Sequence, residues 1–429
     1  MGSMPVESEE NEKAIQVAVQ DCDNKDAGTA AGINIAPGSD DDGWVVPQPI
    51  TLNDGTTIQL YKDGEALHAA YNAIQQAQRR ICLEVYIFAS DDTGCAFADL
   101  LSKKASEGVR VYVIYDSFGS ISSDRNMFRK MRLAGVRLQQ FNPIRPWECR
   151  FSWRPFNRDH RKLLLIDDDI AGMGGLNVGR EYAGSWIIPS NESNHCDFWR
   201  DNAIGLHGPA ARHFFRSFAN TWHYVNSGGR IRKAEFMYNL DALNEPPHGN
   251  ELSILSSVPS RNSPLRPLLH NLFCSAKKSI QLTMAYFAPD DDLIDDLCRA
   301  AKRGVRVQLM LPNKCDVPTL IAAARSFYAK LLDAGIEIYE RQSAILHAKT
   351  LTIDGHTTVI GSTNLDYRSI EYNLELSSII RSKDFGDQMD GLFRNDMTYA
   401  TQITQAQWRR RPMIDRIGQW AVSRARYLL

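Results

Sequence analysis

The chain has 429 residues, of which 43% are hydrophobic and 23% charged, and its 49 basic and 51 acidic side chains give a formal net charge of −2. This length allows two or three domains with cores of their own, and the composition excludes collagen, extended disorder and a disulfide-stapled mini-protein. The eight cysteines form no C-x-x-C pair and no close cluster with histidine, so we expect no metal site and a reducing, cytoplasmic compartment.

The charge is unevenly distributed along the chain. Residues 1–43 contain ten acidic residues but only Lys13 and Lys25, a balance of −8, so the remainder carries +6. This acidic composition with few aromatic residues predicts a disordered tail over residues 1–43. No stretch approaches the roughly 18 apolar residues of a membrane span, so we expect any contact with lipid to be made from the surface.

A strand, helix and strand pattern occurs twice along the chain. An apolar run from Ile81 is followed by a helical pattern over residues 96–107 and by a second apolar run after Gly108. The second half repeats this order, with an apolar run from Ile280, a helical pattern over residues 293–303 and another run after Gly304. Glycine is typical of helix ends, and the apolar runs indicate buried strands. We therefore predict two homologous α/β domains, over residues 44–246 and 247–402, with largely parallel strands joined by helical crossovers.

A polar motif is also duplicated, with identical spacing in both halves. The first copy consists of His160, Lys162 and Asp167, followed by Gly174 and Asn177. The second copy consists of His347, Lys349 and Asp354, followed by Gly361 and Asn364. On a strand, the histidine and the lysine of each copy are two residues apart and point to the same face. A single histidine on a strand is usually a core residue, but the repeated spacing argues against that interpretation here.

Two such motifs facing each other would form a site for a phosphate group. The lysines would neutralise the phosphate oxygens, Asn177 and Asn364 would donate hydrogen bonds to them, and one histidine could attack phosphorus while the other protonates the leaving alcohol. The lysines supply the positive charge, so we expect neither a metal nor a cofactor.

The motifs and the residues around them resemble the phospholipase D superfamily, and most closely bacterial cardiolipin synthases of the phospholipase D type. The resemblance extends from about Trp44 to the C-terminus and is carried by segments such as Glu84-Val-Tyr-Ile-Phe88, Tyr115-Asp-Ser-Phe-Gly119, Asn157-Arg-Asp-His-Arg-Lys162, Leu346-His-Ala-Lys349 and Asn373-Leu-Glu375. It implies two tandem phospholipase-D-like α/β/α sandwich domains with the active site at their interface. It also implies transfer of a phosphatidyl group to histidine and then to an alcohol, with phosphatidylglycerol as donor and acceptor.

The resemblance also suggests roles for individual residues. It makes His160 the nucleophile and His347 the general acid and then base, an order that the symmetry of the two halves does not decide. From their positions after the motifs, we predict that Asp201 orients His160 and that Glu375 orients His347. Asp167 and Asp354 complete the catalytic motifs, and we expect them to hold the motif loops together rather than to contact substrate.

Two segments could contact lipid. Arginine and aromatic residues alternate just before the first motif, and the lipid-contact candidates there are Arg150, Trp153, Arg154 and Arg158. In the alternative interpretation, the aromatic residues are core and the arginines are solvated. Residues 403–429 form a basic amphipathic segment that suits the surface of an anionic membrane, on the cytoplasmic face. A terminal helix packed on the second domain explains that segment equally well.

Three other functions fit parts of the sequence. A phospholipase D would use the same chemistry with water as acceptor and release phosphatidic acid. A nuclease or phosphodiesterase is permitted by the +6 body, but few basic and aromatic repeats support binding of nucleic acid. A binding protein with an inactive site conflicts with two complete motifs. Donor, acceptor, acyl-chain preference and oligomeric state stay open at this point.

Overall fold

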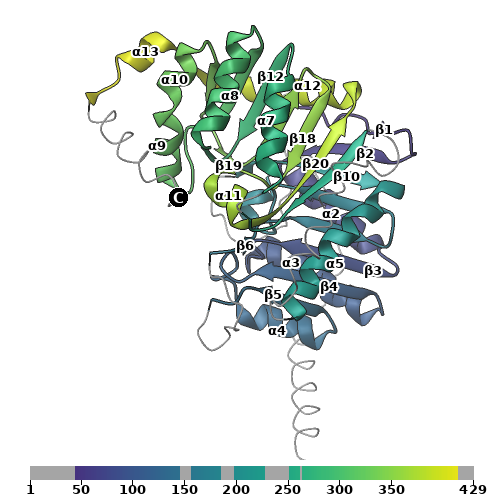
Figure 1. Cartoon of the computed structure of the whole chain (residues 1–429). Coiled ribbons are helices and arrows are strands. Elements are labelled where there is room, and N and C mark those ends of the chain that lie inside the picture. The colour runs from purple at the N-terminus through teal and green to yellow at the C-terminus, as the bar shows by residue number, and fades with distance from the viewer. Residues whose placement is uncertain (1–43, 145–155, 185–197, 228–250, 261–262, 414–429) are drawn as a thin grey trace, which may run out of the picture. The chain divides into compact units, whose positions relative to one another are not determined.

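The structure is a computed structural model that describes residues 44–144, 156–184, 198–227, 251–260 and 263–413 (Figure 1). The predicted acidic tail and the expected domain boundary near residue 246 lie outside the described residues. Within the described part of the chain, no helix has both the length and the hydrophobicity needed to cross a bilayer.

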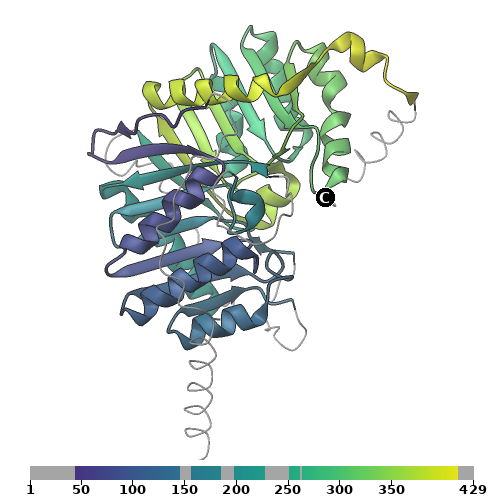
Figure 2. The ribbon, with the colours of Figure 1, turned by 180° about the vertical axis from the view of Figure 1, so that it is seen from behind.

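The first half forms an eight-stranded sheet in the order β1-β2-β10-β8-β7-β3-β4-β5. Its strands are β1 (Ile50–Thr51), β2 (Thr57–Lys62), β3 (Arg80–Val85), β4 (Arg110–Asp116), β5 (Arg137–Phe141), β7 (Leu163–Ile166), β8 (Ile170–Gly174) and β10 (Asn202–His207). Helices α2 (Gly64–Gln76), α3 (Asp92–Ser106) and α4 (Arg125–Leu133) bury apolar side chains against one face of this sheet (Figure 2). Helix α5 (Arg212–Asn226) packs on the other face, which gives the predicted α/β/α layering.

The second half repeats this arrangement with the order β11-β20-β18-β17-β12-β14-β15-β21. Its strands are β11 (Leu252–Ser257), β12 (Ser279–Met284), β14 (Arg306–Pro312), β15 (Glu337–Arg341), β17 (Lys349–Ile353), β18 (Thr357–Gly361), β20 (Asn373–Arg381) and β21 (Ala400–Ile403). Its helices are α7 (Leu265–Ser275), α8 (Asp291–Lys302), α9 (Pro318–Ser326), α10 (Tyr328–Asp333), α11 (Tyr367–Glu371), α12 (Lys383–Thr398) and α13 (Gln405–Arg409). Short strands β6 (Arg158–Asp159), β9 (Trp199–Arg200), β13 (Phe287–Ala288), β16 (Ile345–Leu346) and β19 (Leu365–Asp366) complete the described strands.

The predicted repeat is confirmed, but the strand directions are not those expected. Both helices α3 and α8 end at a glycine in the left-handed region, Gly108 with φ 93° and Gly304 with φ 90°. Along the two strand orders, β3-β4-β5 and β12-β14-β15 pair in parallel and the other neighbours are antiparallel, while β6 pairs in parallel with β20 beside the second path. The prediction of largely parallel strands was therefore wrong. Each motif strand turns back immediately into the next strand, β7 into β8 and β17 into β18, and a tight turn joins only antiparallel strands.

The two halves share one apolar core. It combines residues of β2, β7, β8 and α5 with residues of β20 and α12, all of them buried. Apolar burial of this kind is the dominant favourable term in holding two units together. This shared core includes Leu163 and Leu165 of the motif strand β7, whereas Leu351 and Ile353 of β17 pack in the core of the second half.

Candidate active site

Both motif histidines lie at the start of a buried strand. His160 and Lys162 stand in extended backbone between β6 and β7, whereas Lys349 is the first residue of β17. Arg161 lies between His160 and Lys162 and points to the opposite face. Its guanidinium donates to Thr221 Oγ1 at 2.8 Å and to Ser256 Oγ at 2.7 Å. The expected alternation of side chains is therefore present, and both histidines and both lysines are buried.

Short strand pairs join each motif to the opposite half of the chain. Strand β6 pairs in parallel with the start of β20, and the amide of His160 donates to the carbonyl of Leu374 at 3.0 Å. Strand β16 pairs in parallel with β9, and the amide of His347 donates to the carbonyl of Arg200 at 2.7 Å. Each histidine is therefore aligned with the residue that follows the paired segment in the other half, Glu375 within β20 or Asp201 directly after β9.

This alignment reverses the predicted pairing of the carboxylates. Nδ1 of His160 lies 3.1 Å from Oε1 of Glu375, and Nδ1 of His347 lies 2.6 Å from Oδ2 of Asp201. We predicted Asp201 for His160 and Glu375 for His347, so both assignments were wrong. A carboxylate that follows a motif in the sequence belongs to the same half, but the strand pairing that positions it runs between the halves.

The surroundings of the two carboxylates differ. Glu375 also accepts a hydrogen bond from Ser362 Oγ at 2.5 Å and one from Asn373 Nδ2 at 3.1 Å. Burial by itself would raise the pKa of Glu375, but His160, Lys162 and the Ser362 hydroxyl together lower it. Burial raises the pKa of Asp201 to about 6, although Lys349 opposes the shift. Glu375 is therefore the more firmly ionised of the two.

Burial lowers the pKa of all four basic groups of the motifs, and like charge adds to this effect at His160, Lys162 and His347. Burial and the neighbouring Lys162 lower the pKa of His160 to about 4, and burial with Lys349 and Lys162 lowers the pKa of His347. Burial and Lys349 lower the pKa of Lys162 to about 7, and burial lowers the pKa of Lys349 to about 8. Lys349 lowers the pKa of each of the other three groups, as expected of a lysine near all of them. An anion bound among them would relieve the repulsion and raise each of these pKa values.

The motif asparagines are buried beside the site. Asn177 Oδ1 accepts from the amide of Ile87 at 3.1 Å, and Nδ2 donates to the hydroxyl of Tyr182 at 2.8 Å, which leaves the second N–H of that amide group for a ligand. Asn364 is buried with no hydrogen-bond partner for Oδ1 among the described residues. Contact of either asparagine with a phosphate stays a prediction.

The motif aspartates stand at the other end of the motif strands. Asp167 accepts hydrogen bonds from the amides of Gln78, Arg79 and Arg80. Asp354 accepts from those of Lys277, Lys278 and Ser279. Seven residues of extended chain separate each aspartate from its histidine, roughly 20 Å. Their contacts are those expected of residues that hold the loops together, and we withdraw them from the catalytic set.

The lipid-contact candidates divide into two groups. Arg150, Trp153 and Arg154 lie outside the described residues. Arg158 is 1% exposed, and its guanidinium donates to Ser117 Oγ at 3.1 Å and pairs with Asp116 at 3.3 Å. Its assignment as a lipid contact was wrong, because a buried guanidinium whose partner is a buried carboxylate is held inside the protein.

The start of the C-terminal basic segment packs on the second half. The Trp408 ring lies 4.9 Å from that of Tyr328 and contacts the core of that half. Residues 414–429, which carry most of the amphipathic pattern, lie outside the described residues.

Comparison with known proteins agrees with this geometry. The family model described as "Cardiolipin synthase, PLD-like domain" matches residues 71–187 and 269–397, which contain both motifs. A cardiolipin synthase of Geobacillus thermodenitrificans is 32% identical over 377 residues, covering 88% of this chain and 72% of that protein. A probable cardiolipin synthase of Bacillus subtilis is 30% identical over 368 residues, covering 86% and 71%. The chain belongs to this family.

Two solved structures share the fold of this chain. The phosphatidylserine synthase of Haemophilus influenzae matches with a TM-score of 0.67 at 13% identity, covering 90% of this chain and 97% of that one. The polyphosphate kinase of Porphyromonas gingivalis matches with a TM-score of 0.54 at 14% identity, covering 89% and 56%. These likenesses concern the fold. The family match and the curated relatives identify the chain as an enzyme of the phospholipase D superfamily.

Several residues near the site were not predicted from the sequence. The aromatic rings of Tyr182 and Trp199 lie 5.5 Å and 5.0 Å from the ring of His347, and the ring of Tyr86 lies 5.1 Å from that of His160. Gly175 leaves room for Asp201, since a Cβ there would lie 2.2 Å from Oδ1 of that carboxylate. The sequence contains a sign of this requirement, because Gly174-Gly175 follow the first motif whereas Gly361-Ser362 follow the second.

Proposed function

We propose that this enzyme makes cardiolipin and glycerol from two molecules of phosphatidylglycerol, through a phosphohistidine intermediate. The observation that carries the proposal is the crossed arrangement of two histidines, each bonded through Nδ1 to a carboxylate, with a buried lysine two residues after each histidine. A carboxylate at Nδ1 leaves Nε2 of each histidine for the substrate, and in this proposal the two lysines supply positive charge to its phosphate. The relatives named above support the choice of lipid.

In the first step, Nε2 of His160 attacks phosphorus of the first phosphatidylglycerol. The phosphorus–nitrogen bond forms, the bond to the glycerol headgroup breaks, and His347 gives its proton to the departing glycerol. The phosphorylated imidazole carries positive charge, which Glu375 stabilises through Nδ1–H. We assign the nucleophile to His160 because Glu375, with its bonds from Ser362 and Asn373, is the more firmly ionised carboxylate.

In the second step, the glycerol hydroxyl of another phosphatidylglycerol becomes the nucleophile. His347 takes the hydroxyl proton, the new phosphorus–oxygen bond forms, and the bond to His160 breaks to release cardiolipin. In the free site burial and the lysines lower the pKa of His347, and the anionic phosphate raises it so that His347 can act as the acid in the first step. We further propose that the enzyme acts from the cytoplasmic face, attached to the membrane surface.

Product analysis with the purified full chain tests this proposal. Vesicles containing radiolabelled phosphatidylglycerol should yield labelled cardiolipin and free glycerol, with and without a chelator. His160→Gln should abolish turnover and covalent labelling of the protein. His347→Ala should slow turnover by about 10²–10⁴-fold, the usual worth of a positioned acid and base. If phosphatidic acid is the only lipid product, the enzyme is a phospholipase D and the proposal is wrong.

A further inference from the structure

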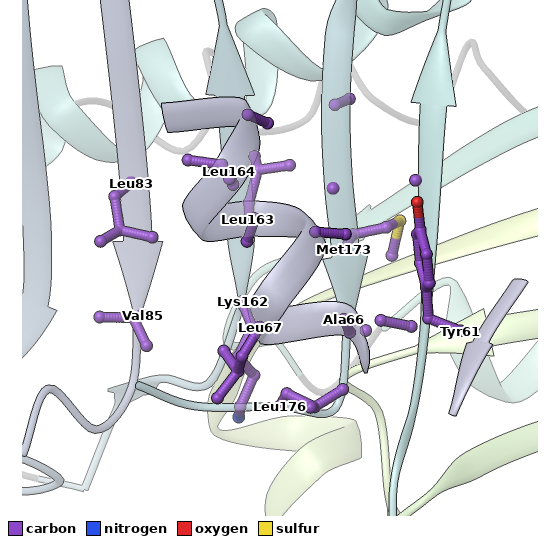
Figure 3. Close-up of a pocket in the computed structure, with 18 of the residues that line it drawn as sticks. Tyr61, Ala66, Leu67, Leu83, Val85, Lys162, Leu163, Leu164, Met173 and Leu176 are labelled. Carbon is purple, nitrogen blue, oxygen red and sulfur yellow. The ribbon is translucent and has the colours of Figure 1, made fainter. Parts of the chain in front are cut away.

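The first half contains an apolar cavity that ends at a catalytic lysine. It has a volume of about 150 Å³ and lies between helix α2 and strands β3, β7, β8 and β10. Leu83, Val85, Leu163 and Met173 are among its apolar lining residues (Figure 3). The side chain of Lys162 lies at one end of the cavity, beside Leu67 and Leu176 (Figure 3).

Small residues on α2 create this cavity. Helix α2 ends at residue 76 and α7 at residue 275, and the strands that follow them begin at residues 80 and 279, so both pairs of positions are 199 residues apart. On this alignment, four alanines that line the cavity correspond to four leucines of the second half. The pairs are Ala66 with Leu265, Ala69 with Leu268, Ala70 with Leu269, and Ala73 with Leu272.

The sheet shows the same difference between the halves. Gly172 of β8 is paired with Gly205 of β10, and both line the cavity. At the corresponding positions of the second half, Val359 of β18 is paired with Ile379 of β20. The backbone does not require glycine at position 172, because a Cβ there would only touch Leu164 at 3.8 Å. Small residues thus line both walls of the cavity, and at position 172 a larger residue is compatible with the fold.

We propose that this cavity binds a hydrocarbon segment of one acyl chain of the lipid whose phosphate is held by Lys162. The proposal rests on the proposed function and adds where the substrate's tail is recognised. The aliphatic stem of Lys162 lines the cavity and its ammonium group belongs to the phosphate site, so the two together match an amphiphile with an anionic head. An engineered protein cavity of the same volume binds benzene, so about six carbons of a chain fit here.

Filling the cavity tests the proposal. Ala70→Leu and Gly172→Val each introduce the residue that the second half has at the matching position. We expect each variant to lower the ratio of kcat/KM for dioleoyl over dibutyryl phosphatidylglycerol at least tenfold, with kcat/KM for the short-chain lipid unchanged. Ala301→Leu on α8, a partly buried alanine outside the cavity, should leave the ratio as in the wild type.

A photoreactive lipid gives a readout that does not depend on turnover. Phosphatidylglycerol with a diazirine in one acyl chain should label peptides of α2 and β8 in the wild type, and this labelling should be lost in the double variant Ala70→Leu, Gly172→Val. An unchanged chain-length ratio in variants that melt as the wild type does, or labelling confined to other segments, would overturn the inference. Wild-type labelling of α2 and β8 without any cardiolipin synthesis would instead refute the proposed function and leave the lipid site standing.

Discussion

Each motif histidine is bonded to a carboxylate that the other half of the chain provides. His160 is bonded to Glu375 and His347 to Asp201, although each carboxylate stands nearer in sequence to the other motif. A carboxylate at Nδ1 fixes the tautomer and stabilises the imidazolium, which in serine proteases is worth about 10⁴-fold in kcat. The halves therefore form one catalytic unit at the level of single side chains.

The crossed pairing predicts crossed effects of substitution. Glu375→Gln should change the ring-nitrogen chemical shifts of His160 and leave those of His347 nearly unchanged, whereas Asp201→Asn should do the reverse. Both changes should lower kcat by about 10²–10⁴-fold. Nitrogen NMR of histidine-labelled protein measures the first effect, with His160→Gln and His347→Gln used to assign the signals. Shifts confined to the histidine of the same half would contradict the pairing.

The buried lysines predict how activity depends on pH. The pKa of Lys162 is lowered to about 7 and that of Lys349 to about 8, so kcat/KM should fall above about pH 7 as these lysines lose their positive charge. On the acid side it should fall as His160, with a pKa of about 4, becomes protonated. Activity measured between pH 4 and 9 should therefore give a bell-shaped profile.

The melting temperature distinguishes this alkaline loss of activity from unfolding of the protein. In the unfolded chain both lysines keep their ordinary pKa of 10.5, so between pH 7 and 9 the unfolded state binds more protons than the folded state. Rising pH then favours the folded state through these two groups. The melting temperature should not drop between pH 7 and 9 while kcat/KM falls, and a parallel drop would assign the alkaline limb to unfolding.

At the scale of elements, the turns at the C-terminal ends of the motif strands hold these strands in position. The turns after β7 and β17 contain Asp167 and Asp354 at positive φ, 52° and 56°. Each carboxylate caps three amides that lead into β3 or β12. Although partial burial opposes the shift, the amides of Ser279, Lys278 and Lys277 lower the pKa of Asp354. These contacts fix the register of the motif strand against its neighbour.

Replacing such an aspartate should affect stability rather than chemistry. Asp354→Ala removes three hydrogen bonds to a partly exposed carboxylate, and we expect the free energy of unfolding to fall by about 1–2 kcal/mol. The kcat of the folded fraction should stay within about twofold of the wild type. Urea denaturation with activity measured on the same samples tests this, and a hundredfold loss of kcat in fully folded protein would return Asp354 to the catalytic set.

For the whole molecule, the net charge of −2 results from an uneven distribution of charge along the chain. Residues 1–43 carry −8 and the rest carries +6, so the acidic segment should weaken attraction of the body to an anionic surface. Deletion of residues 1–43 should strengthen binding to phosphatidylglycerol vesicles at low salt, as measured by sedimentation. The difference should vanish at about 1 M salt, where the Debye length is about 3 Å. Equal binding at low salt would show that this segment takes no part.

The sequence alone determined the duplication, the position and spacing of the two motifs and the structural role of their aspartates. These follow from local spacing, because strand alternation, helix-ending glycines and motif distances are properties of short segments. Strand direction was predicted wrongly, since parallel and antiparallel buried strands have the same apolar pattern. The partners of the histidines were decided only in the tertiary structure. Two symmetric pairings were compatible with the sequence, and the choice between them depends on β6 meeting β20 and β9 meeting β16 across about 150 to 200 residues of chain.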